Sequence, residues 1–280
     1  MACNNMIPVD KRSVLLLTLD SCRYDTFVGA KIPNLRRIGP LYRAKAPSYF
    51  TYGSHAAMFV GFTPGVAEIK GAFVNPKFGK IFRLESPGFS GHGTGGFILS
   101  GDSIMEGFRR KGYAVFGTGA VTWFDPATPT GRRLIEGFDE FYYPGKSWSS
   151  AQQMAWIEDK VDGNPNQPLF LFVNIGETHT PYYHEGADWP ANDNPCVPFQ
   201  ANDRSAECRR RQTLCLEHVD RVIGPLLEAF SDATIIAAAD HGDCWGEDGL
   251  WEHGVSHERT LTVPLLFRLG QIDSKNESQN

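Results

Sequence analysis

The amino-acid sequence predicts an α/β protein, a three-layer α/β/α sandwich around a largely parallel central sheet. Three apolar runs, at 14–19, 169–175 and 235–239, are typical of strands that are buried on both faces. Helical patterns lie between these runs, and strands that alternate with helices favour a parallel sheet. At 280 residues, the chain has the length of one large domain. We therefore expect a single domain over 1–280, with its core at about 11–270.

The first half of the chain alternates strand and helix signals. The helix signals are local ones, namely a proline near the start, a capping side chain or a glycine stop. The expected elements are a helix at 33–38, a helix at 54–62, a helix from Asp102 or Ser103 to Lys111, and a strand at 113–117. The glycine-rich stretch 88–96 lacks the lysine of a phosphate-binding loop, and we interpret it as a surface loop.

The second half holds the clearest strand and the clearest amphipathic helix. A helix is expected at 150–161, and the strand at 169–175 follows it. Apolar residues recur at helical spacing over 209–230, which predicts one long amphipathic helix. The segment 184–206 is rich in Asn, Asp and Pro and is expected to form a long surface loop. The last strand, at 262–269, contains a proline, which places it near an edge of the sheet.

The charge balance and the apolar runs limit the classes of partner. The net charge of -5 argues against a general nucleic-acid or anionic-membrane surface. No apolar run approaches the ~20 residues of a membrane span, and the first residues lack the basic-then-apolar order of a secretory signal. Six cysteines without a Cys-x-x-Cys pair indicate free thiols, with a disulfide or zinc cluster at Cys196, Cys208 and Cys215 as the alternative. We expect a cytoplasmic protein with no nucleic-acid or membrane partner, and the oligomeric state stays open.

Two of the apolar runs end in side chains that bind metals. Asp20 follows the first run, and Asp240 and His241 follow the last one. Ligands bind beyond the carboxyl ends of parallel strands in open α/β sheets, so we expect these side chains at one edge of the sheet. Two carboxylates with one imidazole suit Mn²⁺ or Zn²⁺, whereas Ca²⁺ or Mg²⁺ is less favoured by the histidine. The structural alternative, a helix cap and a core histidine, leaves a buried carboxylate without a partner.

A hydroxyl group stands just before the helix expected at 54–62. Thr51 would serve as a nucleophile only if a metal lowered the pKa of its hydroxyl, because a free alkoxide is out of reach near neutral pH. The first N–H groups of a helix that begins there would also attract an anionic substrate. From the residues alone, the better interpretation of Thr51 is an N-cap, a position that threonine favours.

Four ordered segments carry a resemblance to a known family. They are 19–25, 51–64, 179–181 and 240–243, and the last continues through Glu247 and His253 to 263–264. Together they resemble the alkaline phosphatase superfamily, in its sulfatase-like branch. One Asp-His-Gly triplet is weak evidence, whereas four segments in family order at strand ends are specific. The resemblance extends over nearly the whole chain and implies the same fold.

The resemblance implies a metal site and a nucleophile. Asp20, Asp240 and His241 match the metal ligands of the family. Thr51 falls at the position that binds the metal and attacks phosphorus or sulfur in line, leaving a covalent intermediate. With this match, the nucleophile becomes the leading interpretation of Thr51.

The resemblance also implies catalytic histidines and substrate contacts. His179 and His253 match histidines that contact substrate oxygens, assist the leaving group or hold a second metal. His253 lies twelve residues after His241, which is the family's spacing, and His257 competes with it for the same role. The implied substrate contacts are His55, Asn75 and Thr118.

Two pairs of polar residues are interpreted as supports of the site. Glu177 and Asp243 are expected to orient a ligand histidine from behind. Arg23 and Asp25 are expected to form a structural ion pair near the site.

The segment at 51–55 departs from the pattern of true sulfatases. Their nucleophile is a Cys or Ser that becomes formylglycine, within Cys/Ser-x-Pro-x-Arg, whereas Thr51, Gly53 and His55 occupy these positions here. A threonine cannot become formylglycine, and it is similar to the nucleophile of phosphoethanolamine transferases, nucleotide pyrophosphatases and cofactor-independent phosphoglycerate mutases. We therefore expect metal-dependent hydrolysis of a phosphate or phosphonate ester, a small anionic substrate, through a phospho-threonine intermediate.

Three other functions fit the same residues. A phosphotransferase or mutase would pass the group from Thr51 to an alcohol instead of to water. A sulfatase-like sulfoester hydrolase would keep the metal site but is disfavoured by the threonine. A non-catalytic binding protein would use the fold as a scaffold, which the intact set of Thr51 and metal-binding side chains disfavours.

Overall fold

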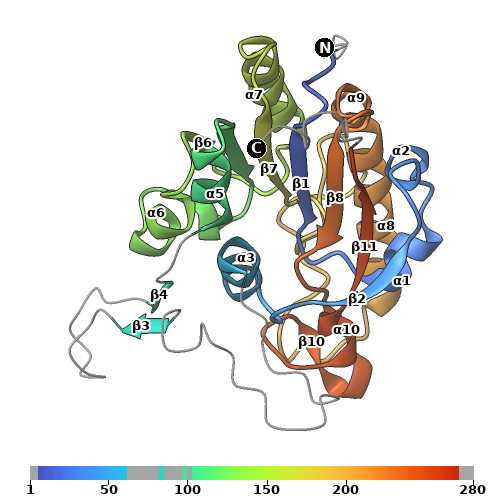
Figure 1. Cartoon of the computed structure of the whole chain (residues 1–280). Coiled ribbons are helices and arrows are strands. Elements are labelled where there is room, and N and C mark those ends of the chain that lie inside the picture. Colours follow the sequence, from blue (N-terminus) through green and yellow to red (C-terminus); the bar gives the residue numbers. More distant parts are fainter. Residues whose placement is uncertain (1–5, 62–81, 85–96, 100–102, 271–280) are drawn as a thin grey trace, which may run out of the picture.

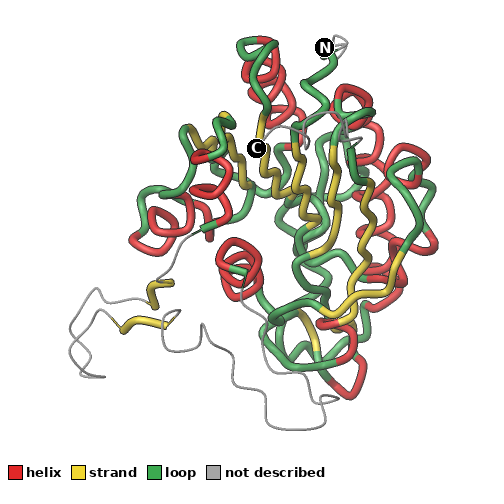
Figure 2. The backbone as a smooth tube through the Cα atoms, viewed as in Figure 1, coloured by secondary structure: helices red, strands yellow, loops and turns green. Residues whose placement is uncertain are grey.

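The computed structural model describes residues 6–61, 82–84, 97–99 and 103–270. Within them, a seven-stranded sheet crosses the molecule in the order β2-β11-β8-β1-β7-β5-β6 (Figures 1 and 2). Its strands are β1 (Val14–Leu19), β2 (Tyr42–Lys45), β5 (Ala114–Gly119), β6 (Glu140–Tyr142), β7 (Leu169–Ile175), β8 (Thr234–Ala239) and β11 (Thr262–Arg268). Strands β1, β5, β6, β7 and β8 pair in parallel. At one side of the sheet, β11 pairs antiparallel with both β8 and the edge strand β2. The largely parallel sheet predicted from the sequence is confirmed.

Helices cover both faces of this sheet (Figure 1). They are α1 (Tyr24–Gly29), α2 (Pro33–Arg36), α3 (Thr51–Val60), α5 (Ile104–Arg110), α6 (Pro129–Ile135), α7 (Ser150–Asp162), α8 (Ser205–Val222), α9 (Gly224–Ala229) and α10 (Glu258–Leu261). Two short antiparallel pairs lie outside the main sheet, β3 (Phe82–Leu84) with β4 (Phe97–Leu99) and β9 (Cys244–Trp245) with β10 (Trp251–Glu252). The short 3₁₀ helices are η1 (Thr122–Phe124) and η2 (Glu247–Gly249).

The two faces of β1 belong to different hydrophobic clusters, which defines the three layers. Leu15, Leu17 and Leu19 pack in the larger cluster, together with residues of α1, α2, α7, α8 and α9. Val14 and Leu16 border the smaller cluster, which contains residues of α3, α5 and α6. Successive side chains of a strand point to opposite faces, so one strand supplies both clusters. The predicted α/β/α sandwich is confirmed.

Local sequence signals placed several helices correctly. The helices expected at 33–38, 54–62 and 150–161 correspond to α2, α3 and α7. Ser103 caps α5, because its Oγ accepts a hydrogen bond of 3.3 Å from the Glu106 N–H. The strands expected at 113–117 and 262–269 correspond to β5 and β11, and β11 lies one strand from the edge, beside β2.

Other elements differ from the prediction. The single helix expected at 209–230 begins at Ser205 and divides into α8 and α9. Pro225 in the first turn of α9 has no N–H to continue the hydrogen bonds of α8, which explains the division. Helix α1 and strand β2 were not predicted. The glycine-rich stretch 88–96 lies outside the described residues.

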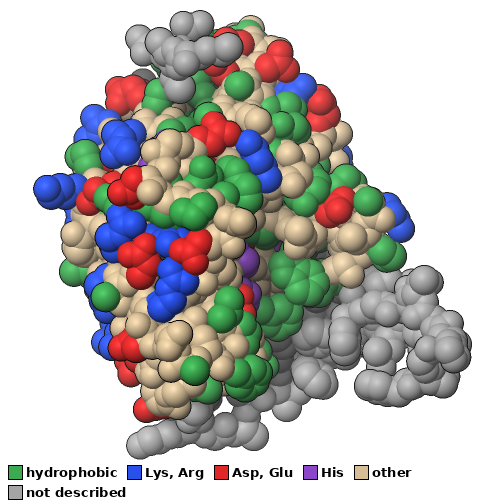
Figure 3. Space-filling view, turned by 180° about the vertical axis from the view of Figure 1, so that it is seen from behind, with side chains coloured by type: hydrophobic (Ala, Val, Ile, Leu, Met, Phe, Trp, Pro, Cys, Tyr) green, Lys and Arg blue, Asp and Glu red, His purple; other side chains and the backbone are tan. Residues whose placement is uncertain are grey.

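The surface carries charges of both signs side by side. Figure 3 shows one face of the molecule, where Lys and Arg side chains lie next to Asp and Glu rather than in a separate field. Arg210 with Glu207 and Arg204 with Asp193 are ion pairs of this kind. Among the described residues, no helix is both long and apolar enough to cross a membrane.

Candidate metal centre and active site

Two carboxylates meet because β1 and β8 end at the same register. Leu19 pairs with Ala239, so Asp20 and Asp240 are the next residues on adjacent parallel strands. Both side chains are fully buried. The N–H of Ser21 donates to Oδ1 of Asp240 at 3.1 Å and ties the two strand ends together. Ligand oxygens of the two carboxylates lie within 4.8 Å of one another, and two buried like charges so close need a cation or a proton between them.

Side-chain alternation turns Asp20 toward helix α3. Thr18, two residues earlier on the same face of β1, lies 2.9 Å from Nε2 of His55 in α3. Asn174 near the end of β7 shares this face, and its Nδ2 donates to Oγ1 of Thr18 at 3.2 Å and to Oδ2 of Asp20 at 3.1 Å. The amide therefore fixes the Asp20 carboxylate against the N-terminal end of α3.

His241 completes a cluster of three metal-binding side chains. Its Nε2 lies 3.5 Å from Oδ2 of Asp240 and 3.9 Å from Oδ1 of Asp20. Its Nδ1 lies 3.1 Å from the Gly242 carbonyl oxygen, a hydrogen bond that leaves Nε2 as the free lone pair. Ligand atoms of the three side chains all lie within 4.8 Å of one another, a spacing that one ion can bridge.

Helix α3 begins with the hydroxyl group predicted to react. The Oγ1 atom of Thr51 lies 3.2 Å from Nε2 of His241 and 3.4 Å from Oδ2 of Asp20. The N-cap of α3 is Phe50, and no side chain caps this helix, so the interpretation of Thr51 as an N-cap is wrong. The hydroxyl instead joins the cluster at the N-terminal end of a 10-residue helix, where an anionic group is favoured.

Two small residues hold the start of α3 in place. The Ser54 hydroxyl donates to the Asp240 carbonyl oxygen at 2.7 Å, which anchors the helix to the end of β8. A Cβ atom on Gly53 would lie 2.5 Å from Oγ of Ser48 and 2.9 Å from a ring carbon of Phe50. Glycine is therefore required where the preceding loop folds back against the helix.

The protonation states of the cluster suit a bound cation. Burial works to raise the pKa of Asp20, but the neighbouring histidines, His179 foremost, hold it below its ordinary value. Burial and the negative charge of Asp20 raise the pKa of Asp240 well above its ordinary value. Burial lowers the pKa of His241 to about 4. His241 is therefore neutral near pH 7, which is the form that binds a metal.

A buried oxygen atom without a hydrogen-bond partner in the described part of the chain indicates that a metal ion fits these residues. The Oδ2 atom of Asp240 is buried and has no hydrogen-bond partner among the described residues. An unsatisfied buried polar atom costs roughly 1–3 kcal/mol, and more when it is charged. This oxygen belongs to the cluster of Asp20, Asp240 and His241. A divalent cation would satisfy it and relieve the repulsion between the two carboxylates, so the donor set fits such an ion.

His179 and His253 lie beside the metal cluster. The ring centre of His253 is 4.6 Å from that of His241 and 5.1 Å from that of His179. Burial works to lower the pKa of His253, but its hydrogen bond to Asp243 raises the pKa to about 9. The imidazole is therefore a cation near neutral pH. The structure thus brings Asp20, Thr51, Asp240, His241, His179 and His253 together, as the sequence predicts.

His257 lies in a different place from its competitor His253. Its Nδ1 accepts a hydrogen bond of 3.0 Å from the Arg259 N–H and caps helix α10. Its Nε2 lies 3.2 Å from Oδ2 of Asp248. Both nitrogens are engaged at the start of α10, so His253 is the histidine that belongs with the cluster.

The predicted substrate contact at His55 does not fit its position. The side chain is fully buried and lies edge-on against Phe124 and Phe172. Its Nε2 lies 2.9 Å from Oγ1 of Thr18, and its Nδ1 lies 2.8 Å from the carbonyl oxygen of Thr51. Both nitrogens are used inside the protein, so His55 supports the first turn of α3 and cannot reach a substrate.

The other two predicted substrate contacts are not brought to the cluster either. Thr118 is buried in β5, where its Oγ1 accepts a hydrogen bond of 3.1 Å from Nε2 of Gln153. Gln153 also donates to the Asn174 carbonyl oxygen at 2.9 Å, so Thr118 belongs to a structural network behind the site. Asn75 lies outside the described residues.

Sequence reasoning missed two supporting amides. Asn174 was not recognised, although a single amide inside the apolar run 169–175 is a signal that could have found it. Gln212 of α8 donates to the carbonyl oxygens of Ser21 and Thr178 at 2.9 and 3.0 Å and fixes two loops of the site. No local pattern distinguishes Gln212 from the other polar residues of its helix.

Of the residues expected to support the site, three have the expected contacts and one does not. The Arg23–Asp25 ion pair is confirmed at 2.7 Å, and the buried guanidinium also pairs with Glu247 at 2.8 Å. Asp243 lies 2.8 Å from Nδ1 of His253, as expected for a carboxylate that orients a histidine. The same prediction is wrong for Glu177, whose Oε1 accepts from the Ser150 N–H at 2.7 Å instead.

The five cysteines among the described residues are free and buried. No candidate metal group in that part of the chain contains a cysteine. The free-thiol interpretation is confirmed for Cys196, Cys208 and Cys215, and the disulfide or zinc cluster is not formed.

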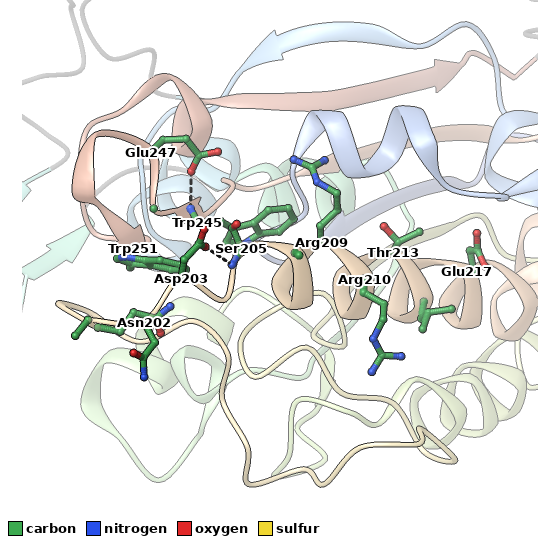
Figure 4. A pocket seen from close by; sticks show the side chains of 15 residues that line it. Asn202, Asp203, Ser205, Arg209, Arg210, Thr213, Glu217, Trp245, Glu247 and Trp251 are labelled. Atoms are coloured by element: carbon green, nitrogen blue, oxygen red, sulfur yellow. Dashed lines mark hydrogen bonds between the residues drawn. The ribbon is translucent and has the colours of Figure 1, made fainter.

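A groove of about 1020 Å³ runs along the first turns of α8, beside the β9–β10 pair (Figure 4). Trp245 and Trp251 lie at one end of it, and Arg209 and Arg210 project from α8 on either side. None of the metal-binding side chains lines this groove. It is therefore separate from the cluster, although Trp245 connects the two regions.

Comparison with known proteins agrees with this fold. The model of the sulfatase family matches residues 85–280. A sulfatase of Formosa agariphila is 22% identical over 325 residues, and the match covers 92% of this chain and 64% of that protein. The chain thus spans less than two thirds of the length of that relative.

Solved structures of the alkaline phosphatase superfamily resemble most of the chain. The C-terminal periplasmic domain of phosphoethanolamine transferase EptC from Campylobacter jejuni is 11% identical, with 95% of this chain and 81% of that chain covered and a TM-score of 0.61. The corresponding domain of EcEptC from Escherichia coli, in complex with Zn, is 15% identical. That match covers 94% of this chain and 74% of the other chain, with a TM-score of 0.64. The phosphonate monoester hydrolase of Agrobacterium radiobacter is 16% identical. That match covers 92% of this chain and 68% of the other chain, with a TM-score of 0.56. At these identities the likeness shows a shared fold, and the predicted resemblance is confirmed.

Proposed function

The chain belongs to the sulfatase family, and from this premise we propose that it is a metal-dependent hydrolase of phosphate or phosphonate esters with Thr51 as nucleophile. The observation that carries the proposal is the position of Oγ1 of Thr51, 3.2 Å from Nε2 of His241 and 3.4 Å from Oδ2 of Asp20. This hydroxyl caps no helix and faces side chains that suit a metal. The substrate is a small anionic ester.

Asp20, Asp240 and His241 would hold the metal, with the Thr51 hydroxyl beside them. When bound, a divalent ion lowers the pKa of a hydroxyl group and polarises a phosphoryl oxygen. Two carboxylates and one imidazole suit Zn²⁺ or Mn²⁺. Zn²⁺ is the first ion to test, because a solved structure of similar fold is a complex with Zn.

Each reactive side chain of the site has a separate role in the reaction. Oγ1 of Thr51 gives its proton to solvent and attacks phosphorus in line, so an O–P bond forms while the bond to the leaving oxygen breaks. His253, a cation near neutral pH, gives its proton to that leaving oxygen. His179 donates to a phosphoryl oxygen as charge develops. In the second half, His253 takes a proton from water, the water oxygen attacks phosphorus, the bond to Oγ1 breaks, and Oγ1 regains its proton from solvent.

The threonine favours phosphorus over sulfur as the centre attacked. A sulfatase nucleophile is made from Cys or Ser, and threonine does not yield the formylglycine that sulfate ester hydrolysis uses in this family. Gly53 and His55 also replace the proline and arginine of that motif, and both are required by local packing. Hydrolysis of a sulfate ester is therefore the less favoured activity.

A phosphotransferase is the second candidate, because the fold also resembles a phosphoethanolamine transferase domain. It would use the same attack by Thr51 and differ only in the acceptor, an alcohol instead of water. Turnover measured with and without added alcohols separates the two, since a transferase yields a new ester whereas a hydrolase yields inorganic phosphate or free phosphonate.

Turnover by the metal-loaded protein tests the proposal. The metal-stripped chain is refilled with Zn²⁺ or Mn²⁺ and given nitrophenyl phosphate mono- and diesters, phosphonate monoesters and nitrophenyl sulfate. We expect metal-dependent release of nitrophenol from the phosphorus esters, lost by on the order of 10³-fold or more in Thr51→Ala. Thr51→Ser, which keeps a hydroxyl, is the matched control and retains measurable activity. Metal-dependent turnover that survives in Thr51→Ala contradicts the proposal, as does a chain that binds no divalent metal.

The proposal also includes the absence of nucleic-acid and membrane partners and a cytoplasmic location. The absence of nucleic-acid and membrane partners rests on the net charge and the apolar runs of the sequence. The proposed cytoplasmic location is supported by the free, buried cysteines of the described residues, because thiols persist in a reducing compartment. Separating compartments from cells that make the native protein, followed by immunoblotting, tests the location.

A further inference from the structure

Three hydrogen bonds connect Trp245 to His253 through two buried side chains. Nε1 of Trp245 donates to Oη of Tyr182 at 2.8 Å. Oη of Tyr182 lies 2.7 Å from Oδ2 of Asp243. Oδ1 of the same carboxylate lies 2.8 Å from Nδ1 of His253. We propose that Tyr182 is a positioning residue for His253 and acts through Asp243, an inference that rests on the proposed function.

The chemistry of the groups fixes the direction of each bond. An indole N–H only donates, so the Tyr182 oxygen must accept at the Trp245 end. The tyrosine then has one proton left, and it goes to Oδ2 of Asp243. The carboxylate accepts at both oxygens, so Nδ1 of His253 must carry the proton that lies between them. Trp245 thereby determines which nitrogen of His253 keeps its proton when the ring becomes neutral, although it does not touch that histidine.

Burial makes this arrangement rigid. Tyr182 and Asp243 have no exposed surface, and Trp245 is 3% exposed. Water cannot replace a lost partner here, so an alternative rotamer of Asp243 would leave a buried oxygen or hydroxyl unsatisfied. The guanidinium of Arg23 packs 3.9 Å from the centre of the Trp245 ring and holds it against the groove shown in Figure 4.

The backbone at Tyr182 supports a specific requirement for this side chain. Its φ angle is 55°, in the left-handed region that bulky residues seldom occupy. Such a conformation is strained and persists where the surroundings fix it. The Tyr182 carbonyl oxygen also accepts from Nε1 of Trp189 at 2.9 Å, so both ends of the residue are held.

The hydrogen-bond chain determines the role of Nε2, the other nitrogen of His253. With Nδ1 bound to Asp243, Nε2 is the nitrogen left for the substrate, on a ring that borders His241 and His179. A proton given to a leaving oxygen must come from Nε2 in this orientation. Tyr182 therefore matters most for esters whose leaving group needs that proton, and least for nitrophenol, which leaves as an anion.

Two readouts on the zinc-loaded full chain test the proposal, using Tyr182→Phe and the matched control Tyr183→Phe. The first is the proton resonance of the His253 imidazole N–H, assigned with ¹⁵N-labelled histidine and the His253→Gln variant. We expect a protonated Nδ1 in the wild type and in Tyr183→Phe, with exchange at least about tenfold faster in Tyr182→Phe. This readout needs no substrate, so it decides the hydrogen-bond chain even if the proposed function fails.

The second readout is the dependence of kcat on the leaving group. In Tyr182→Phe we expect kcat for an alkyl ester to fall by roughly 10–100-fold, while kcat for the nitrophenyl ester and KM for both change by less than about threefold. A purely structural role would lower both rates equally, and that result overturns the proposal. It is also overturned if Nδ1 is unprotonated in the wild type, or if a second zinc ion binds and is lost in Asp243→Asn. If Tyr182→Phe does not fold, the presence or absence of the Nδ1 proton in the wild type still supports or overturns the proposal.

Discussion

Asp20 and Asp240 directly follow two neighbouring parallel strands whose last residues, Leu19 and Ala239, are partners in the sheet. The register of the sheet therefore places two carboxylates side by side in a buried position. One of them, Asp240, has an oxygen without a hydrogen-bond partner among the described residues. This arrangement is unfavourable for the fold by itself and favourable for binding a cation.

The first prediction concerns the metal-free protein. Asp240→Asn removes a buried carboxyl group whose ionisation beside Asp20 is unfavourable, and near neutral pH it should raise the free energy of unfolding of the metal-free chain by roughly 1–3 kcal/mol. The same substitution should weaken metal binding by more than about tenfold. Metal at 100 times its Kd should stabilise the wild type by about 2.7 kcal/mol and the variant by much less. Urea unfolding with and without zinc measures both effects.

Asp220→Asn is the control for this prediction. Asp220 is also fully buried, but its oxygens accept hydrogen bonds from the Leu35 N–H at 2.7 Å and the Asn34 N–H at 3.2 Å. An amide there would face donors with a donor, so this substitution should destabilise the chain with or without metal. Equal destabilisation by both substitutions would contradict the view that Asp240 is held in place for a cation.

The second prediction concerns Gly53 in helix α3. Alanine is the better helix former, yet a Cβ atom here would lie 2.5 Å from Oγ of Ser48. Gly53→Ala should therefore lower the free energy of unfolding by roughly 1–3 kcal/mol. Gly107→Ala in α5 is the matched control, because none of the described atoms lies within 4 Å of its Cβ, and it should gain about 0.5–1 kcal/mol. Equal effects at both positions would refute the packing argument.

The third prediction is a pH dependence that originates at Glu177. Burial raises the pKa of this carboxyl to about 7. Because the folded pKa lies above the unfolded value, the protonated side chain stabilises the fold at low pH, and this stability is lost as the pH rises from about 4.5 to 7. Glu177→Gln should therefore be more stable than the wild type at pH 8, by up to about 3 kcal/mol, and similar to it near pH 4.5.

Thermal unfolding across this pH range tests the Glu177 prediction. Glu185→Gln is the comparison, since that carboxylate is exposed and pairs with Lys146 at the surface. A stability difference between Glu177→Gln and the wild type that does not change with pH would show that the buried carboxyl is not the titrating group.

The apolar runs made much of the sheet and the metal ligands predictable. β1, β7 and β8 have mostly apolar sequences because both of their faces are covered, and Asp20, Asp240 and His241 stand where such runs end. β2 was not predicted because its residues are mostly exposed, and it forms a strand only where β11 offers a partner. Helix α1 has no side-chain cap and is only 6 residues long, so it left no clear pattern.

The supports of the site were less predictable than its ligands. His55 matched a substrate-contacting position by alignment, yet its nitrogens bind Thr18 and the Thr51 backbone. Its role depends on β1 lying under α3, which no local pattern encodes. Asn174 and Gln212 hold Asp20 and two loops through contacts across the fold, and such contacts become visible only when the layers are assembled.

The most direct measurement is the capture of the covalent intermediate on Thr51. The zinc-loaded protein is mixed with a nitrophenyl phosphate or phosphonate ester, quenched in acid within one turnover, digested and analysed by mass spectrometry. We predict one phosphoryl or phosphonyl group on the peptide that contains Thr51, absent without metal and absent in Thr51→Ala. Turnover that proceeds with this peptide unmodified, or with the group on another residue, would contradict the account.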